Sequence, residues 1–244
     1  MAEEFYTPKY DGIIFDLDGT LIDSLEDLID ACNSMLGHYG LPPKSYEEGK
    51  GLIGRGIRNL VKRALPEEMG KDESLLDEAE AFMKADYATR YTRKTRPYDG
   101  IKELIRYLHV KRIPFGICTN KPIEAAREIV DGLFDIKEFV DVIGQQAGQP
   151  RKPDPTQTLA LAEKMGVAPK RCIYMGDSKV DYETAKNAGM LPVLCTWGFT
   201  APKELEAFKD AIWIKKPHRA IDAFKYGFDM YSIFGECKDD ELNG

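Results

Sequence analysis

Two aspartates separated by one residue follow a short apolar run near the start of the chain. The run occupies residues 13–15, and Asp16 and Asp18 come directly after it, ahead of a glycine that marks a turn. A continuous apolar run of this kind is typical of a strand buried on both faces. Because alternate residues of an extended chain point to the same side, the two carboxylates would face one pocket.

Paired carboxylates at the end of a buried strand predict a cation site. They repel each other and are costly to desolvate unless a positive ion lies between them. Hard oxygen ligands in small number suit Mg²⁺, which keeps several waters and shares its coordination shell with a phosphate. The alternative is that residues 16–20 form only a polar turn, because Asp and Gly are common turn residues.

Polar groups follow a second predicted strand, over residues 113–118. Thr119 and Asn120 come next, before a predicted helix whose first N–H groups would add to an anion site. Further on, Lys152 lies in a proline-flanked loop, where it would bind a phosphate as a point charge. Taken singly, the first two residues could be helix caps and the lysine could be a solvated loop residue.

Two more acids follow the predicted strand at 171–175. Asp177 falls where a further metal ligand belongs, and Asp181 lies one helical turn later on the same side. Both could instead cap a helix N-terminus. Ligands of open parallel sheets collect at the carboxyl ends of the strands, and four such ends carrying complementary groups are hard to explain by capping alone.

The elements that must position these groups fall into two kinds. Between about residues 22 and 95 the pattern predicts only helices: one capped by Ser24, one opened by a capping box at Ser45, one from 57 to 65, and one from 73 to 94. From residue 100 onward helices and short apolar strands alternate, which predicts a parallel sheet covered on both sides. The expected helices are 100–111, 122–132, 155–166, 179–188 and 218–227, and the expected strands are 113–118, 139–143, 171–175, 191–195 and 211–214.

We therefore predict an α/β fold, a doubly wound parallel sheet with an inserted all-helical domain. Residues 1–22 and 95–235 would form the sheet domain, residues 23–94 the helical cap, and residues 236–244 a polar tail. The formal charge of −7 and the pI near 5.2 argue against nucleic acid or an anionic membrane as the main partner.

The absence of an apolar stretch near the ~20 residues of a membrane span, together with an acidic start, leads us to expect a cytoplasmic protein. The five widely spaced cysteines contain no Cys-x-x-Cys pair, so we expect reduced thiols rather than a metal or redox site.

The four groups also resemble a known pattern. Residues 16–20, residues 119–120, Lys152 and residues 176–181 are similar, in order, to the four motifs of the haloacid dehalogenase-like (HAD) hydrolase superfamily, and the resemblance covers essentially the whole chain. The helical insert resembles the small C1-type cap of that superfamily. Residues 119–122, 151–153 and 197–199 are most similar to its phosphoglycolate phosphatase branch.

The resemblance implies a Mg²⁺-dependent phosphatase acting on a small phosphorylated acid or sugar. Asp16 would attack phosphorus to give an aspartyl-phosphate, and Asp18 would protonate the leaving group and then activate water. Mg²⁺ would be bound by the Asp16 carboxylate, the Asp18 backbone carbonyl and Asp177. The phosphoryl group would be held by a hydroxyl, an amide and an ammonium, from Thr119, Asn120 and Lys152.

Two further residues are implied in supporting roles. Asp181 would orient Lys152 or a metal-bound water. Arg55, between two glycines of the cap, would pair with a substrate carboxylate, although a solvated arginine is an equal alternative. We expect a monomer or homodimer with a small-molecule phosphorylated substrate. A hexose-phosphate mutase of the β-phosphoglucomutase type and a non-enzymatic Mg²⁺ and phosphate binding module are the rival functions.

Overall fold

The structure is a computed structural model that describes residues 10–53 and 56–228. Arg55, Cys237 and the predicted tail at 236–244 lie outside the described residues. The other four cysteines are free thiols and all are buried, as expected. Within the described part of the chain, no helix combines the length and the apolar character that a membrane crossing requires.

A six-stranded sheet forms the centre of the molecule, and β1 (Gly12–Phe15) lies in its interior. The strand order is β5-β4-β1-β6-β7-β8, and every neighbouring pair is parallel. The remaining strands are β4 (Phe115–Pro122), β5 (Val142–Gln145), β6 (Cys172–Gly176), β7 (Leu191–Cys195) and β8 (Ile212–Ile214). The predicted α/β class with a parallel sheet is confirmed.

Side chains of β1 alternate between two apolar cores, one on each face of the sheet. Ile13 and Phe15 belong to the larger core, and Ile14 belongs to the smaller one. The larger core is closed by α6 (Ile101–Val110), α7 (Ile123–Leu133) and α11 (Pro217–Tyr226), and the smaller by α8 (Thr156–Met165) and α9 (Lys179–Ala188). The period-2 alternation of a strand thus places one run of apolar residues in both cores.

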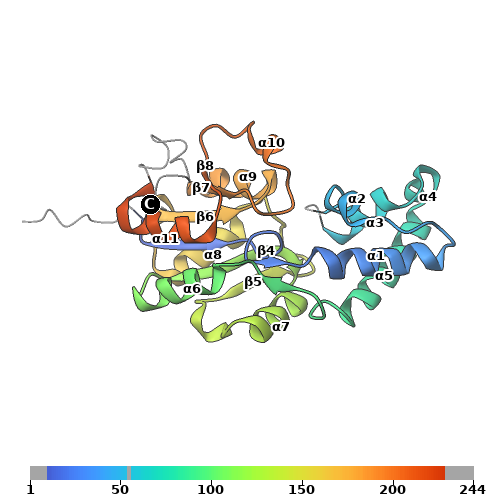
Figure 1. The fold of residues 1–244 in the computed structure, drawn as a ribbon, viewed down its shortest axis with the longest axis horizontal. Coiled ribbons are helices and arrows are strands. Elements are labelled where there is room, and N and C mark those ends of the chain that lie inside the picture. Colours follow the sequence, from blue (N-terminus) through green and yellow to red (C-terminus); the bar gives the residue numbers. More distant parts are fainter. Residues whose placement is uncertain (1–9, 54–55, 229–244) are drawn as a thin grey trace, which may run out of the picture.

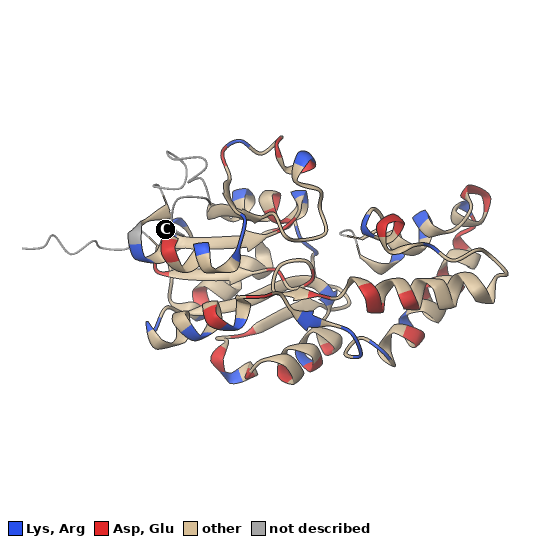
Figure 2. Cartoon of the chain, in the orientation of Figure 1, with Lys and Arg blue, Asp and Glu red and all other residues tan. Residues whose placement is uncertain are grey.

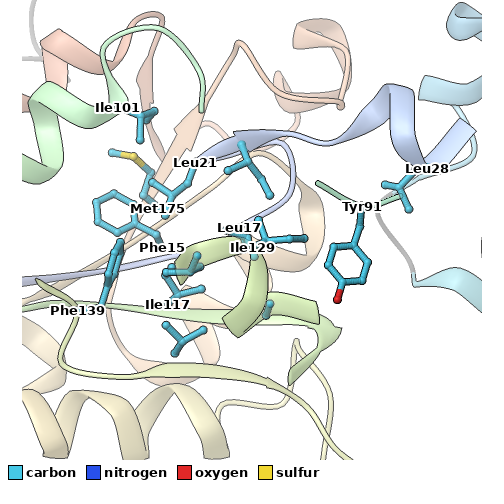
Figure 3. Close-up of a cluster of buried hydrophobic side chains, with 14 of the residues drawn as sticks. Phe15, Leu17, Leu21, Leu28, Tyr91, Ile101, Ile117, Ile129, Phe139 and Met175 are labelled. Carbon is cyan, nitrogen blue, oxygen red and sulfur yellow. The ribbon is translucent and has the colours of Figure 1, made fainter. Parts of the chain in front are cut away.

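The larger core continues from the sheet toward the start of the helical segment. Figure 3 shows Phe15 and Met175 packed beside Phe139 and Ile117, with Leu21 on the same side. All five side chains are buried. Because this packing surrounds the segment that carries the first two aspartates, it fixes their position relative to the neighbouring strands.

Short elements complete the sheet domain. They are the 3-10 turns Ile136–Glu138 and Pro169–Arg171, and the helix α10 (Pro202–Leu205). Figure 2 shows that the strands are largely free of charge and that acidic and basic residues are mixed over the helices and loops.

Five helices lie together at one side of the sheet (Figure 1). They are α1 (Leu25–His38), α2 (Tyr46–Lys50), α3 (Ile57–Ala64), α4 (Glu67–Lys71) and α5 (Glu73–Ala88), which we call the cap helices. The capping box at Ser45 is present, with both of its hydrogen bonds to Glu48. We keep residues 23–94 as the proposed cap domain and residues 1–22 and 95–235 as the proposed core.

Some elements differ from the sequence prediction. The helix expected over 73–94 ends at Ala88, because the Thr89 hydroxyl donates to the Asp86 carbonyl and turns follow. The five-residue helix α4 was not predicted. The strand expected over 113–118 is β4 and continues to Pro122 with an irregularity in its pairing to β5, so Thr119 and Asn120 lie within it rather than beyond it.

A two-stranded ribbon, which the sequence did not predict, joins the two parts of the chain. β2 (Ile22–Asp23) pairs antiparallel with β3 (Arg96–Pro97), so the strands leaving and re-entering the core run side by side. Just beyond the ribbon, the buried Asp27 carboxylate accepts hydrogen bonds from the backbone of Lys94 and from Thr95. Two-residue strands have no periodicity to detect, which is why the sequence predicted none here.

Candidate active site

The polar strand ends meet on the wall of one cleft of about 1420 Å³ between the sheet and the cap helices. The predicted site residues that line it are Asp16, Asp18, Thr119, Asn120, Lys152, Asp177 and Asp181. Arg55 is the one predicted site residue that the described residues do not include. Because β1, β4 and β6 are adjacent and parallel, their carboxyl ends deliver these groups to the same edge of the sheet.

Lys152 lies at the centre of the acidic groups. Its Nζ is 2.8 Å from Asp16 Oδ1, and it donates hydrogen bonds to Asp181 Oδ1 at 2.7 Å and to the Tyr174 hydroxyl at 2.9 Å. The ammonium is close to Asp16 Oδ1 but is not aligned for a hydrogen bond, and that buried oxygen has no hydrogen-bond partner. Asp16 Oδ1 therefore has Lys152 as an ion-pair partner but accepts no hydrogen bond.

The backbone of Lys152 is held as firmly as its side chain. The Lys152 N–H donates to Asn120 Oδ1 at 2.9 Å, and Asn120 Nδ2 donates to the Lys152 carbonyl at 3.1 Å. Both ends of the Asn120 amide are thus engaged with the loop that carries the lysine. Asn120 therefore fixes the position of the neighbouring cation, and its predicted contact with phosphate stays a prediction.

Three carboxylates form a compact group that fits a metal ion. One oxygen from each of Asp16, Asp177 and Asp181 lies within 4.8 Å of the others. Asp177 Oδ2 accepts from the backbone N–H of Phe199 at 2.7 Å. Both oxygens of Asp181 are already used, because Oδ1 accepts from Lys152 and Oδ2 accepts from Ser178. Asp16 and Asp177 are therefore the carboxylates best able to bind a metal ion. Asp181 is already held by Lys152 and Ser178.

Capping and site chemistry coexist at Asp181. Its carboxylate closes a capping box with Ser178 at the start of α9 while it also binds Lys152. The capping alternative considered for this residue is therefore correct, and the same side chain still reaches the lysine because the first turn of α9 faces the cleft.

The electrostatics of the group favour a bound cation. Burial, together with the Asp181 and Asp18 carboxylates and against the attraction of Lys152, raises the pKa of Asp16 to about 6. Burial and the nearby Asp181 and Asp16 carboxylates raise the pKa of Asp177 well above its usual value. Although burial opposes it, the Asp16 and Asp181 carboxylates hold the pKa of Lys152 well above its usual value. One lysine does not compensate three buried acids, so a divalent cation would relieve the remaining repulsion.

Asp18 has a different set of partners from Asp16. Its Oδ1 accepts from Ser24 Oγ at 2.5 Å and from Lys121 Nζ at 2.8 Å. Ser24 occupies the N-cap position of α1, but its side chain makes no capping bond, so its predicted capping role is wrong. The hydroxyl donates to the Asp18 carboxylate. The two neighbouring acids thus sit in separate environments, which two distinct chemical roles would require.

Glycines allow the backbone to close around Asp177. A Cβ on Gly19, whose φ is +81°, would lie 2.5 Å from Asp177 Oδ2, and a Cβ on Gly198 would lie 2.3 Å from Asp177 Cβ. Only glycine fits at either position without moving the loops. Gly19, which marks the first turn in the sequence, therefore also leaves space for the Asp177 carboxylate.

Sequence reasoning missed three residues of the site. Tyr174 contacts Lys152, and its hydroxyl donates to the Cys118 carbonyl at 2.7 Å, but in sequence it is one more apolar strand residue. Lys121 follows Thr119 and Asn120 directly, so its place in that run was the available signal. Tyr87 comes from the cap, and nothing local in the sequence marks it.

Comparison with known proteins agrees with this geometry. The chain matches the haloacid dehalogenase-like hydrolase family over residues 13–194. It is 33% identical over 230 residues to a phosphoglycolate phosphatase of Pseudomonas putida, covering 93% of this chain and 79% of that protein. It is 36% identical over 194 residues to a phosphoglycolate phosphatase of Rhodospirillum rubrum, covering 78% of this chain and 80% of the relative.

Solved structures show the same fold. A candidate phosphoglycolate phosphatase from Lactobacillus delbrueckii subsp. bulgaricus superimposes with a TM-score of 0.81 at 30% identity, covering 88% of this chain and 98% of the other. A predicted phosphoglycolate phosphatase from Haemophilus somnus gives a TM-score of 0.79 at 27% identity, covering 89% of this chain and 100% of the other. The resemblance inferred from the motifs is confirmed. The chain therefore belongs to the haloacid dehalogenase-like hydrolase family, in its phosphoglycolate phosphatase-like branch.

Proposed function

We propose that this protein is a Mg²⁺-dependent phosphatase that hydrolyses a small phosphorylated metabolite through an aspartyl-phosphate on Asp16. The observation that carries the proposal is the convergence of Asp16, Lys152 and Asp177 on one cleft, with the Lys152 ammonium 2.8 Å from Asp16 Oδ1. Membership of a hydrolase family whose relatives include phosphoglycolate phosphatases supports the reaction class.

The first step forms a bond between Asp16 and phosphorus. Its carboxylate attacks the phosphoryl group, the bond from phosphorus to the leaving oxygen breaks, and Asp18 donates a proton to that oxygen. In the second step Asp18 takes a proton from water, which attacks phosphorus and releases Asp16. The separate partners of the two acids support this division of roles.

Positive charge for the phosphoryl oxygens comes from Lys152. Its buried ammonium is aimed by Asp181, Tyr174 and the Asn120 bonds to its backbone, so it loses little freedom when it binds phosphate. Thr119, which is also buried and lines the cleft, is the proposed hydroxyl donor. Asn120 holds the Lys152 backbone, and the second N–H of its amide is the proposed donor to phosphate.

Asp16 and Asp177 would hold the Mg²⁺, with the Asp18 carbonyl as the third proposed protein ligand. When bound, the ion reduces the repulsion between the anionic nucleophile and the anionic phosphoryl group. Asp181 is kept as the residue that orients Lys152.

The leaving group would be a short acid or a sugar. The cap helices line the cleft with charged residues of both signs, among them Lys50, Arg63, Glu47 and Glu80. Such residues suit a polar metabolite of modest size rather than an apolar ligand. The place of Arg55 as the carboxylate partner stays a prediction, as do the cytoplasmic location and the monomeric or dimeric state.

A hexose-phosphate mutase is the second function that this fold can house. It would have to return the phosphoryl group to a sugar rather than to water. The relatives named above are phosphatases, and they do not favour it.

The test is a substrate panel with 2-phosphoglycolate, hexose phosphates and p-nitrophenyl phosphate, assayed with Mg²⁺ and with a chelator. We expect phosphate release that needs the metal and is abolished in Asp16→Asn. Interconversion of sugar phosphates without phosphate release would favour the mutase, and no turnover of any substrate would contradict both.

A further inference from the structure

Lys121 is a buried cation with no role in the proposed mechanism. Its side chain is 3% exposed, and its Nζ donates to Asp18 Oδ1 at 2.8 Å and to Asp18 Oδ2 at 3.1 Å. A buried ammonium must be paired and hydrogen-bonded, or it is very costly. Its remaining bond goes to the Tyr87 hydroxyl at 2.7 Å.

Tyr87 belongs to the other part of the molecule. It lies near the end of the cap helix α5, it is buried, and Lys121 Nζ also lies 4.8 Å from the centre of its ring. The chain of contacts therefore runs from a cap helix, through a core lysine, to the carboxylate proposed as the acid and base.

We propose that Tyr87 and Lys121 are positioning residues that hold the Asp18 carboxylate in place for proton transfer and make its position depend on the seating of the cap. The proposal rests on the proposed phosphatase function of this site. Tyr87 does not contact the reacting atoms; it acts on Asp18 through Lys121.

The arrangement around Asp18 supports this role. Its second donor, Ser24, stands where α1 of the cap begins, so both contacts of the carboxylate are tied to the cap. Withdrawal of α5 would take the Tyr87 hydroxyl from Lys121 and leave a buried donor without a partner. The lysine would then shift, and the carboxylate that it holds by both oxygens would shift with it.

If Tyr87 served only to hold the cap on the core, its loss should affect all substrates alike. The chain offers Tyr91 as a matched control. Tyr91 stands one turn beyond Tyr87, is buried, packs against it with ring centres 5.6 Å apart, and donates its hydroxyl across the same boundary to Glu128 of α7. This bond ties cap to core through Glu128 rather than through Lys121 and Asp18.

Substrates with different leaving groups distinguish a positioning role of Tyr87 from a purely structural one. An alkoxide such as that of 2-phosphoglycolate must receive the Asp18 proton as the bond from phosphorus to oxygen breaks. A p-nitrophenolate is stable without one, so forming the aspartyl-phosphate from p-nitrophenyl phosphate does not depend on the placement of the acid. The value of kcat/KM reports this first step for each substrate.

The experiment compares kcat/KM for the two substrates in the parent protein, Tyr87→Phe, Tyr91→Phe and Asp18→Asn, with thermal unfolding to check folding. We expect Tyr87→Phe to lose about tenfold with 2-phosphoglycolate and less than about twofold with p-nitrophenyl phosphate, a fraction of the 10²–10⁴ that a general acid supplies. Asp18→Asn should show the same selectivity more strongly, and Tyr91→Phe should show none.

Lys121→Met is the second arm and should reproduce the selective loss. Equal losses on both substrates in Tyr87→Phe, no loss at all, or the same selectivity in Tyr91→Phe would overturn the proposal. A parent protein that hydrolyses neither substrate would instead overturn the proposed function, so the two failures are distinguishable.

Discussion

Asn120 and Lys152 are joined in both directions, with the asparagine amide accepting from the Lys152 N–H at 2.9 Å and donating to its carbonyl at 3.1 Å. The pair lies between the end region of β4 and the loop that leads to α8. A loop lysine thereby acquires the rigidity of a strand residue. The position of the cation proposed to bind phosphate thus depends on an uncharged neighbour.

Asn120→Ala should therefore lower activity because it loosens the backbone of Lys152. The substitution leaves the Lys152 N–H and carbonyl without partners, at a cost of about 1–3 kcal/mol for such groups, and kcat/KM should fall roughly 10–100-fold. Steady-state kinetics with 2-phosphoglycolate measure this. Asn187→Ala is the control, because Asn187 makes one exposed bond to the adjacent Pro153 carbonyl and should matter little. Equal effects of the two variants would contradict the role of Asn120.

The raised acid pKa values predict how stability depends on pH and on the metal. Without a divalent cation, burial raises the pKa of Asp16 from 3.8 in the unfolded chain to about 6 in the folded protein. Between about pH 4 and pH 6 the folded state thus holds more protons, so the free energy of unfolding falls as the pH rises through this window. Asp177 is shifted in the same direction.

Ionisation of the buried acids lowers the free energy of unfolding, and a bound cation should restore it. The effect of the cation should therefore be confined to pH values at which the acids are ionised. Mg²⁺ should therefore raise the midpoint of thermal unfolding more at about pH 7.5 than at about pH 5. Scans with Mg²⁺ and with a chelator measure the difference. Asp177→Asn should lose most of the shift, and the exposed Asp131→Asn should keep it. A shift that is equal at both pH values, or that survives in Asp177→Asn, would refute the proposed ligand set.

Gly198 should tolerate no side chain. A Cβ there would lie 2.3 Å from Asp177 Cβ and 2.4 Å from the Gly19 carbonyl oxygen, so Gly198→Ala must displace the loop that donates to Asp177. We expect a loss of activity of at least about tenfold and weaker Mg²⁺ binding, measured by kinetics at varied Mg²⁺. Gly37→Ala, in α1 with nothing within 4 Å of its Cβ, should keep full activity and gain up to about 1 kcal/mol of stability. Full activity in Gly198→Ala would show that the contact is unimportant.

The sequence predicted the parts of the site that depend on chain direction alone. In a parallel sheet, a polar residue directly after an apolar strand arrives at one known edge, so Asp16 and Asp177 could be placed together from their positions in the chain. The strands themselves were recognisable because buried strands are continuous apolar runs. Lys152 was added by the proline-flanked loop and by the resemblance to the family.

The parts that were missed depend on contacts between distant segments. Tyr87 and Lys121 meet across the boundary between cap and core, and no local pattern connects them. Ser24 had the right residue type and place for a helix cap, but its hydroxyl donates to Asp18 and its oxygen accepts from no N–H group of α1. The ribbon of β2 and β3 is likewise set by a tertiary pairing, whereas the end of α5 at Ala88 is marked by local bonds from Thr89 to Asp86 that periodicity does not reveal.

The central claim is that Asp16 carries the phosphoryl group, and hydride trapping tests it most directly. Borohydride added during turnover reduces an aspartyl-phosphate to homoserine, which mass spectrometry locates in the sequence. We predict homoserine at position 16 in the parent protein, only when substrate and Mg²⁺ are both present, and none in Asp16→Asn. Continued turnover with residue 16 unmodified, or with the modification at another acid, would contradict the account.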